Sequence, residues 1–354
     1  MTRAGAFALA LLATLAVPAA ASARTAAAPE TIAHRADLGG GPVRAAAPFD
    51  FLGVQWRGPR EGVAVRLRRA GRWGAWRALH AGDVHRPGRH ASDLLPAGGA
   101  TAYQVRLPAG ARDGRASAIT VPADARARAS APAPPAGLPV RHCTRTRAQW
   151  GADESLRFAP DGTEIWPPAY FPVQKLTVHH TVTEGGAAGA GDPAAIVRAI
   201  YRYHAVELGF GDIGYQLLVD ANGCIYEGRH SGPDDVPVYA ARTADGSTPL
   251  AVNAGHTAGY NAGNVGVALL GDFTGQQPTA RARAGLVRAL AALARTSGLD
   301  PLGSGLYVNP INGFTKDVPT ITGHRDWLAT ECPGDELYPL LPDIRRAVAG
   351  LVAS

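Results

Sequence analysis

Histidine and cysteine side chains are spaced along the second half of the chain in a way that suits a metal ion. Cys332 follows His324 by eight residues and comes just before Pro333-Gly334. A continuous helix would place positions eight apart about 12 Å from each other. That distance is too long for two ligands bound at about 2.0 and 2.3 Å to one zinc ion. The segment between them is therefore predicted to form a loop.

A third ligand is available on an upstream β-type run, Val178-His-His-Thr181. Successive residues of a strand point to opposite faces, so only one of the two histidines joins the site. His179 shares its face with threonines, whereas His180 shares its face with aliphatic residues, and this favours His179. Each residue alone is more typical of a buried structural group. Together, His179, His324 and Cys332 predict a zinc site with a fourth position open for water.

The elements that must position these residues alternate between strands and helices from residue 141 onward. Asn222-Gly223 predicts a hairpin turn, and Asp192 before Pro193 predicts the start of a helix. We expect strands over residues 175–181, 215–220, 224–227 and 264–273, and helices over residues 192–208, 277–297 and 335–352. This alternation predicts an α/β fold with a mixed central sheet flanked by helices.

The region before residue 141 has a different organisation. Residues 1–23 combine Arg3, a short apolar stretch and a small-residue cleavage site, which is typical of a secretory signal peptide. The apolar stretch falls short of the roughly 20 residues that a membrane helix needs, and no later segment could span a membrane. Residues 24–48 are expected to be a flexible lead.

Short alternating runs between Gly and Pro residues predict a small all-β module, of sandwich type, over residues 49–121. A Pro/Ala-rich linker over residues 122–140 would join it to a domain over residues 141–354. Trp56, Trp73 and Trp76 form either a sugar-stacking surface or, as is commoner in small β domains, part of the packing.

Charge is divided unevenly between these two regions. Residues 24–143 carry 18 arginines against 8 acidic residues, whereas residues 144–354 carry 16 basic against 21 acidic residues. The asymmetry favours an anionic partner for the first region. An exported chain without a nucleic-acid-binding motif is not expected to bind nucleic acid. An anionic polymer of the cell envelope therefore fits the positive charge better. A merely solvated arginine surface is an equally good explanation.

A series of ordered motifs resembles bacterial peptidoglycan recognition proteins, which belong to the type 2 N-acetylmuramoyl-L-alanine amidase family. The motifs are Arg147-Ala-Gln-Trp-Gly-Ala152, Val178-His-His-Thr181, Asp212-Ile-Gly-Tyr215, Gly223-Cys-Ile-Tyr-Glu-Gly-Arg229, Gly255-His-Thr-Ala-Gly-Tyr-Asn261, Val265-Gly-Val-Ala-Leu-Leu-Gly271, Gly323-His-Arg and Cys332-Pro-Gly334. The resemblance covers about residues 141–354. It implies the amidase fold, a zinc ion on His179, His324 and Cys332, and hydrolysis of the amide that joins the lactyl group of peptidoglycan to its stem peptide.

The resemblance also implies roles for residues around the metal. The catalytic tyrosine of the family corresponds to Tyr215, whose hydroxyl group would donate a hydrogen bond to the developing oxyanion. Related phage amidases carry a lysine where this chain has Thr330, as recognition proteins do. Thr330 can hydrogen-bond but cannot titrate near neutral pH, so the identity of the general acid/base stays open. His256 is expected to contact substrate or to support a metal ligand, and Asn261 and Asn264 are expected to line the cleft.

The remaining cysteines, Cys143 and Cys224, should form a disulfide in an exported protein if Cys332 binds metal. Two buried free thiols are the alternative. The sequence thus predicts a secreted, cell-wall-directed zinc amidase acting on peptidoglycan. The alternative is a recognition module that binds muropeptide without cutting it, since some recognition proteins lack the cysteine ligand. The three ligands and Tyr215 favour the enzyme, and no His-Glu-x-x-His helix points to a metallopeptidase.

Overall fold

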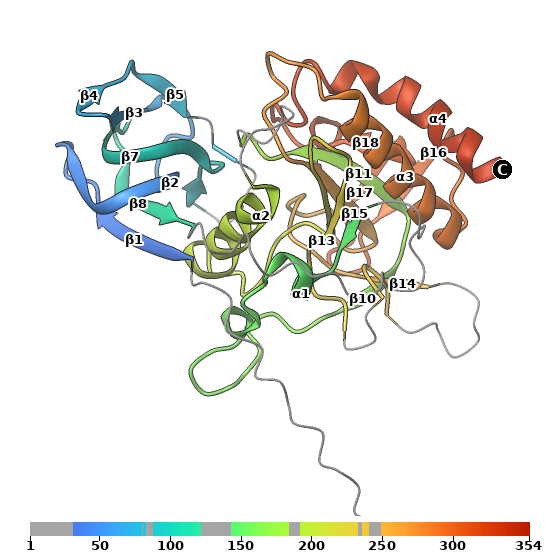
Figure 1. Cartoon of the computed structure of the whole chain (residues 1–354). Helices are drawn as coiled ribbons and strands as arrows, with labels where there is room; N and C mark the ends of the chain where they lie inside the picture. Colours follow the sequence, from blue (N-terminus) through green and yellow to red (C-terminus); the bar gives the residue numbers. More distant parts are fainter. Residues whose placement is uncertain are drawn as a thin grey trace, which may run out of the picture.

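The computed structural model describes residues 31–79, 81–82, 88–121, 143–183, 192–232, 236–240 and 249–354. The expected signal peptide (1–23) lies outside these residues, as do the expected linker (122–140) and the first part of the expected lead. The described residues form an all-β body beside a mixed α/β body, with helix α2 (Pro193–Arg202) between the two sheets (Figure 1). Among the described residues, no helix is long and apolar enough to cross a membrane.

The N-terminal body is one antiparallel sheet of eight strands, ordered β1-β8-β2-β7-β3-β4, with β5 paired to β3 and β6 paired to β2. The strands are β1 (Ile32–Asp37), β2 (Val43–Arg57), β3 (Val63–Arg69), β4 (Arg72–Trp73), β5 (Arg77–Leu79), β6 (His90–Ala91), β7 (Leu95–Arg106) and β8 (Arg112–Thr120). Register shifts in the long strand β2 allow one sheet to bend. Among the residues that the structure describes, the strands of this body therefore belong to one continuous sheet, where the sequence predicted a sandwich.

The expectation of a flexible lead is wrong for residues 32–37 and 43–48. These residues form β1 and the first part of β2. Strand β1 pairs with β8 along its whole length, from Ile32 opposite Thr120 to Asp37 opposite Arg115. The Ala/Gly/Pro-rich composition hid this strand because its order comes from backbone pairing with a segment about 80 residues away.

The α/β body has a six-stranded sheet in the order β18-β11-β15-β12-β13-β9, and two small sheets, β10-β14 and β16-β17. Its strands are β9 (Thr144–Arg145), β10 (Tyr170–Pro172), β11 (Lys175–His180), β12 (Leu217–Val219), β13 (Ile225–Glu227), β14 (Leu250–Val252), β15 (Asn264–Leu269), β16 (Ser304–Val308), β17 (Thr315–Pro319) and β18 (Ile321–Gly323). Strand β11 is parallel to β15 and β18, and β12 is antiparallel to β13. The predicted mixed central sheet is confirmed.

The helices begin and end close to the predicted residues. Besides α2, they are α1 (Arg147–Trp150), α3 (Ala280–Ser297) and α4 (Leu341–Ala353). The side chain of Asp192 accepts a hydrogen bond from the amide of Ala194 and caps α2 as predicted. Helix α2 continues into a π-helical turn, Tyr203–Glu207. Helix α3 starts later than predicted because Thr279 caps it, and α4 starts only after a 3-10 turn, Tyr338–Leu340.

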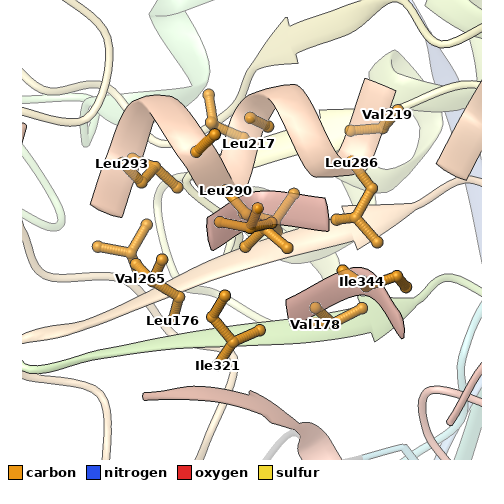
Figure 2. Close-up of a cluster of buried hydrophobic side chains, with 14 of the residues drawn as sticks. Leu176, Val178, Leu217, Val219, Val265, Leu286, Leu290, Leu293, Ile321 and Ile344 are labelled. Atoms are coloured by element: carbon orange, nitrogen blue, oxygen red, sulfur yellow. The ribbon is translucent and has the colours of Figure 1, made fainter. Parts of the chain in front are cut away.

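One face of the six-stranded sheet is apolar and is covered by α3 and α4. Figure 2 shows leucines of α3 packed over sheet side chains such as Leu176 and Val178 of β11, with Ile344 of α4 beside them. Because side chains alternate along a strand, His179 lies on the opposite face. The apolar layer thus fixes which of the two adjacent histidines can reach a site on the other side.

A disulfide joins Cys143 and Cys224, whose Cα atoms are 4.6 Å apart. The amide of Ile225 donates a hydrogen bond to the carbonyl of Cys143, and β9 pairs with β13 directly after it. The bridge therefore attaches the start of the α/β body to the edge of its sheet. Cys332 is the one cysteine outside the disulfide, and it is buried.

Candidate metal centre

His179, His324 and Cys332 lie together at one end of the central sheet. His179 lies near the end of β11, and His324 directly follows the neighbouring parallel strand β18. The segment to Cys332 forms a loop, which the amide of Arg325 closes by donating to the carbonyl of Cys332 at 3.0 Å. The three candidate donor atoms lie within 4.8 Å of one another, and all three side chains are buried. The Nδ1 atom of His180 accepts a hydrogen bond from the amide of Phe273, at 3.3 Å.

The distances in this cluster fit a tetrahedral zinc ion. The Nδ1 atom of His179 lies 3.6 Å from the Sγ atom of Cys332. Bonds of about 2.0 Å to nitrogen and 2.3 Å to sulfur in tetrahedral geometry place those two ligand atoms roughly 3.5 Å apart. The amide of His180 also donates to Sγ of Cys332, at 3.4 Å, and thereby favours the thiolate. Two imidazoles and one thiolate make a donor set typical of zinc.

A chain of hydrogen bonds sets the tautomer of His179. The Nε2 atom of His256 lies 3.1 Å from the carbonyl oxygen of Asn264, which can only accept, so His256 carries its proton on Nε2. Its Nδ1 atom is then an acceptor, which the Nε2 of His179 reaches at 3.0 Å and the hydroxyl of Thr257 reaches at 2.7 Å. His179 is thereby left with an unprotonated Nδ1 facing Cys332, as a metal ligand requires. Burial lowers the pKa of His256 to about 3 and that of His179 well below 6.5, so both rings are neutral at pH 7.

The two asparagines expected to line the cleft support the His256 loop. The side-chain oxygen of Asn261 accepts hydrogen bonds from the amides of His256 and Thr257, at 3.0 and 2.7 Å. Asn264 is buried, where its side chain accepts from the hydroxyl of Thr177. Neither asparagine lines the pocket beside the cluster. Both side chains satisfy buried backbone and side-chain donors, and their expected place along the substrate cleft stays a prediction.

A pocket opens beside the three-residue cluster. It is lined by His324, Cys332, His256, Tyr215 and His204 from the α/β body, and by Ser92, Asp93 and Leu94 from the N-terminal sheet, among others. The ring of half-buried Tyr215 lies 5.3 Å from that of His179, centroid to centroid. His204 accepts a hydrogen bond from the amide of Gly214, and burial lowers its pKa to about 4. The pocket thus joins the metal-ligand candidates to the predicted catalytic tyrosine.

The loop that carries Tyr215 is held by a buried ion cluster. Asp212 is fully buried and lies 3.0 Å from Nη1 of Arg147 and 2.7 Å from Nη1 of Arg229. It also accepts from the amides of Ile213 and His230. Burial alone would raise the pKa of Asp212, but the two arginines outweigh burial and lower it. The carboxylate stays charged and fixes the chain three residues before Tyr215.

Thr330 lies behind Cys332 and outside the pocket lining. Its hydroxyl oxygen accepts a hydrogen bond from the amide of Cys332 at 3.1 Å. Thr330 therefore positions the sulfur-bearing residue. No local sequence pattern marks Ser92, Asp93 and Leu94 as pocket residues, because they come from the other body and meet the pocket across more than 80 residues of chain.

Comparison with known proteins agrees with this geometry. A profile of N-acetylmuramoyl-L-alanine amidases matches residues 169–335. Over 170 residues the chain is 31% identical to a peptidoglycan recognition protein from Trichoplusia ni, covering 47% of this chain and 72% of that protein. The chain belongs to the peptidoglycan recognition protein and N-acetylmuramoyl-L-alanine amidase family. This member of the family carries all three candidate metal ligands in one buried cluster.

Other members of the family bear both kinds of name. The human N-acetylmuramoyl-L-alanine amidase is 31% identical over 206 residues, which cover 58% of this chain but only 28% of the human protein. A solved structure of peptidoglycan recognition protein LE in complex with tracheal cytotoxin is 24% identical, with a TM-score of 0.40 over 57% of this chain and 93% of that one. The names of the sequence relatives, amidase and peptidoglycan recognition protein, point to peptidoglycan and leave cutting and binding to be distinguished.

Proposed function

We propose that the protein is an exported, zinc-dependent N-acetylmuramoyl-L-alanine amidase. Its reaction would be hydrolysis of the amide between the lactyl group of muramic acid and the L-alanine of the stem peptide. One observation carries the proposal: the donor atoms of His179, His324 and Cys332 lie within 4.8 Å of one another, in a pocket that Tyr215 also lines. A module that only binds peptidoglycan has no need of one thiol and two imidazoles buried in this arrangement.

The residues around the pocket have separate tasks in this reaction. When bound, zinc supplies a Lewis acid that lowers the pKa of water and polarises a carbonyl group. His256 holds the proton of His179 on Nε2, and Thr330 holds the backbone of Cys332, so the ligand atoms stay aimed at the ion. The hydroxyl of Tyr215 donates a hydrogen bond to the carbonyl oxygen as negative charge develops there.

Release of new N-terminal alanine from purified sacculi tests the proposal. The zinc-loaded chain should generate free alanine amino groups in step with the loss of lactyl amides. A chain that holds zinc, binds sacculi and releases no amino groups would be the alternative, a recognition module that only binds. A chelator-treated sample serves as the matched control, because it leaves the sequence unchanged while removing the metal.

Export of the protein is part of the proposal. The Cys143–Cys224 disulfide supports it, because disulfides persist outside the cytosol. Fractionation of producing cells should find the mature chain outside the membrane, starting near residue 24. A chain found only in the cytosol with both thiols reduced would contradict export without affecting the metal site.

A basic surface on the N-terminal sheet favours a second binding activity, toward an anionic polymer of the cell envelope. The guanidinium of Arg66 lies between Trp73 and Trp76, at 4.8 and 4.9 Å from their ring centroids, and Arg106 lies 3.9 Å from Trp76. Beside this stack is a cavity of about 320 Å³, which arginines line. Trp56, in contrast, is fully buried and donates to the carbonyl of Pro59, so it belongs to the packing.

Exposed Arg72 and Arg77 border the same cavity, and they allow this binding to be tested. Replacing both with glutamine should weaken retention on a phosphate-bearing wall polymer and reduce the salt dependence of that retention. The matched control is Arg112→Gln, on a different strand of the module. Equal retention of the double variant and the control would contradict a specific anion site.

A further inference from the structure

The pocket beside the metal centre has walls from both bodies. Ser92, Asp93 and Leu94 directly follow β6 of the N-terminal sheet and line the same pocket as Tyr215 and Cys332. More than 80 residues of chain separate the two walls. The N-terminal sheet therefore reaches the place where a substrate would meet the metal ligands.

Hydrogen bonds hold the 92–94 turn rigidly in this position. The amide of Ser92 donates to the carbonyl of Val54 at 2.8 Å, and the hydroxyl of Ser92 accepts from the amide of Val54 at 3.0 Å. From the other body, the hydroxyl of Tyr203 donates to the carbonyl of Ser92 at 2.9 Å. Leu94 is 3% exposed and belongs to the same hydrophobic cluster as Ile200 and Tyr203. Residues 92–94 are therefore a fixed part of the pocket lining.

The docking of the two bodies extends beyond this turn. The carboxylate of Glu207 accepts hydrogen bonds from Ser117 and Arg35, and its backbone carbonyl accepts from Gln55. Gly53 leaves room for the ring of Tyr203, because a Cβ atom there would lie 2.2 Å from Cε2 of the ring. Satisfied buried polar groups and close packing together fix one arrangement of the two bodies.

The side chains that line the pocket indicate which kind of substrate group they would contact. The metal side of the pocket is polar, whereas Leu94 of the N-terminal sheet and Ile200 of α2 supply aliphatic surface. The pocket leaves about 40 Å³ to water-sized groups, and one water needs about 10–15 Å³ by this measure. The aliphatic surface of Leu94 and Ile200 suits a small apolar group of a substrate.

We infer that Leu94 and Ile200 form the subsite for the small apolar side chain next to the amide that is cut, so that the N-terminal sheet is part of the substrate site. The inference rests on the proposed function, in which that side chain is the methyl group of alanine. Leu94 is then a specificity-determining residue, because its size limits the group that can sit beside the metal.

Soluble muramoyl peptides with alanine or valine as the first stem residue test this subsite. The wild-type chain should prefer alanine, and Leu94→Ala should raise the kcat/KM for valine relative to alanine by about tenfold or more, as pocket changes of this size do elsewhere. The matched control is Leu107→Ala, a leucine of the same body that directly follows β7 and does not line the pocket. Zinc content should equal that of the wild type in both variants.

A second variant and a second readout keep the test decisive. Ile200→Val removes one methylene from the opposite side of the subsite with little effect on folding, and it should shift the preference toward valine in the same direction. Calorimetric binding of the same peptides to the zinc-loaded chain reports the preference without turnover. If the wild type binds both peptides but cuts neither, the proposed function is wrong. A binding preference that shifts toward valine in the variants would still support the subsite. If the preference for alanine over valine is unchanged in both folded, zinc-loaded variants, in kcat/KM and in binding, the proposed subsite is wrong.

Discussion

The Nε2 atom of His179 lies 3.0 Å from the Nδ1 atom of His256, and the far side of the His256 ring is bonded to the carbonyl of Asn264. This relay leaves the Nδ1 lone pair of His179 facing the sulfur of Cys332. His256→Phe keeps a ring of similar size but removes the acceptor. We expect zinc affinity to fall about 10- to 100-fold, the usual effect of losing such a partner.

Competition with a chelating dye would measure the zinc affinity of His256→Phe. His256→Gln, whose side-chain oxygen can accept the same proton, is the matched comparison and should recover part of the affinity. Wild-type affinity in the phenylalanine variant would show that the relay does not act on the metal ligand.

Cys332→Ala should bind no stoichiometric zinc, because two ligands remain and each removed ligand costs orders of magnitude in affinity. Elemental analysis of the purified variant gives the answer. Thr330→Val is the control, because it removes only the hydrogen bond to the amide of Cys332 and keeps every ligand atom. One zinc per chain in Cys332→Ala would refute the ligand assignment.

Tyr215→Phe should lower kcat by about 10²- to 10³-fold, the range for loss of one oxyanion donor. Zinc content and thermal stability should stay at wild-type values, since the variant loses only the phenolic hydroxyl. Amide hydrolysis measured with a muramoyl peptide, together with elemental analysis, separates the two effects. Unchanged turnover would leave Tyr215 a structural role only.

Asp212→Asn should lower the free energy of unfolding by about 3–5 kcal/mol, because it leaves Arg147 and Arg229 buried without their counter-charge. Urea unfolding of the zinc-free chain measures the change. Glu154→Gln is a matched control: Glu154 also pairs with Arg147, but its side chain is 45% exposed, so the expected loss is at most about 1 kcal/mol. Equal losses in the two variants would contradict a structural role specific to buried Asp212.

The zinc-free chain should lose stability as the pH falls below about 6.5. Burial lowers the pKa of His204 to about 4 and that of His256 to about 3 in the folded state, against about 6.5 in the unfolded chain. Between these values only the unfolded state binds the protons, so acid favours unfolding. Each histidine contributes up to about 1.4 kcal/mol per pH unit.

Urea unfolding at pH 7.0, 6.0 and 5.0 would measure this slope. His204→Gln, whose side chain can still accept the hydrogen bond from Gly214, should reduce the slope by about one proton. A slope that is unchanged in this variant would show that His204 does not titrate as burial requires.

The sequence by itself determined several strands and helices of the α/β body and the set of candidate metal ligands. Alternation of apolar and polar residues in 175–181 located β11 and favoured His179 over His180. Successive side chains of a strand point to opposite faces, so a short stretch of sequence is enough to tell the two histidines apart. Asp192 and Pro193 marked the start of α2 for the same reason. The ordered motifs identified the family, which the comparisons confirmed.

Only the tertiary structure decided which side chains meet across long stretches of chain. The pairing of β1 with β8 turned an expected flexible segment into a strand. The side chain of Asn261 and the backbone carbonyl of Asn264 both bind His256, which local spacing did not indicate. The 92–94 turn reaches the metal pocket through contacts with Tyr203. Such contacts depend on how the two bodies pack against each other. Packing depends on the shapes of the two surfaces and on buried hydrogen-bond partners, and the spacing of residues within one segment specifies neither.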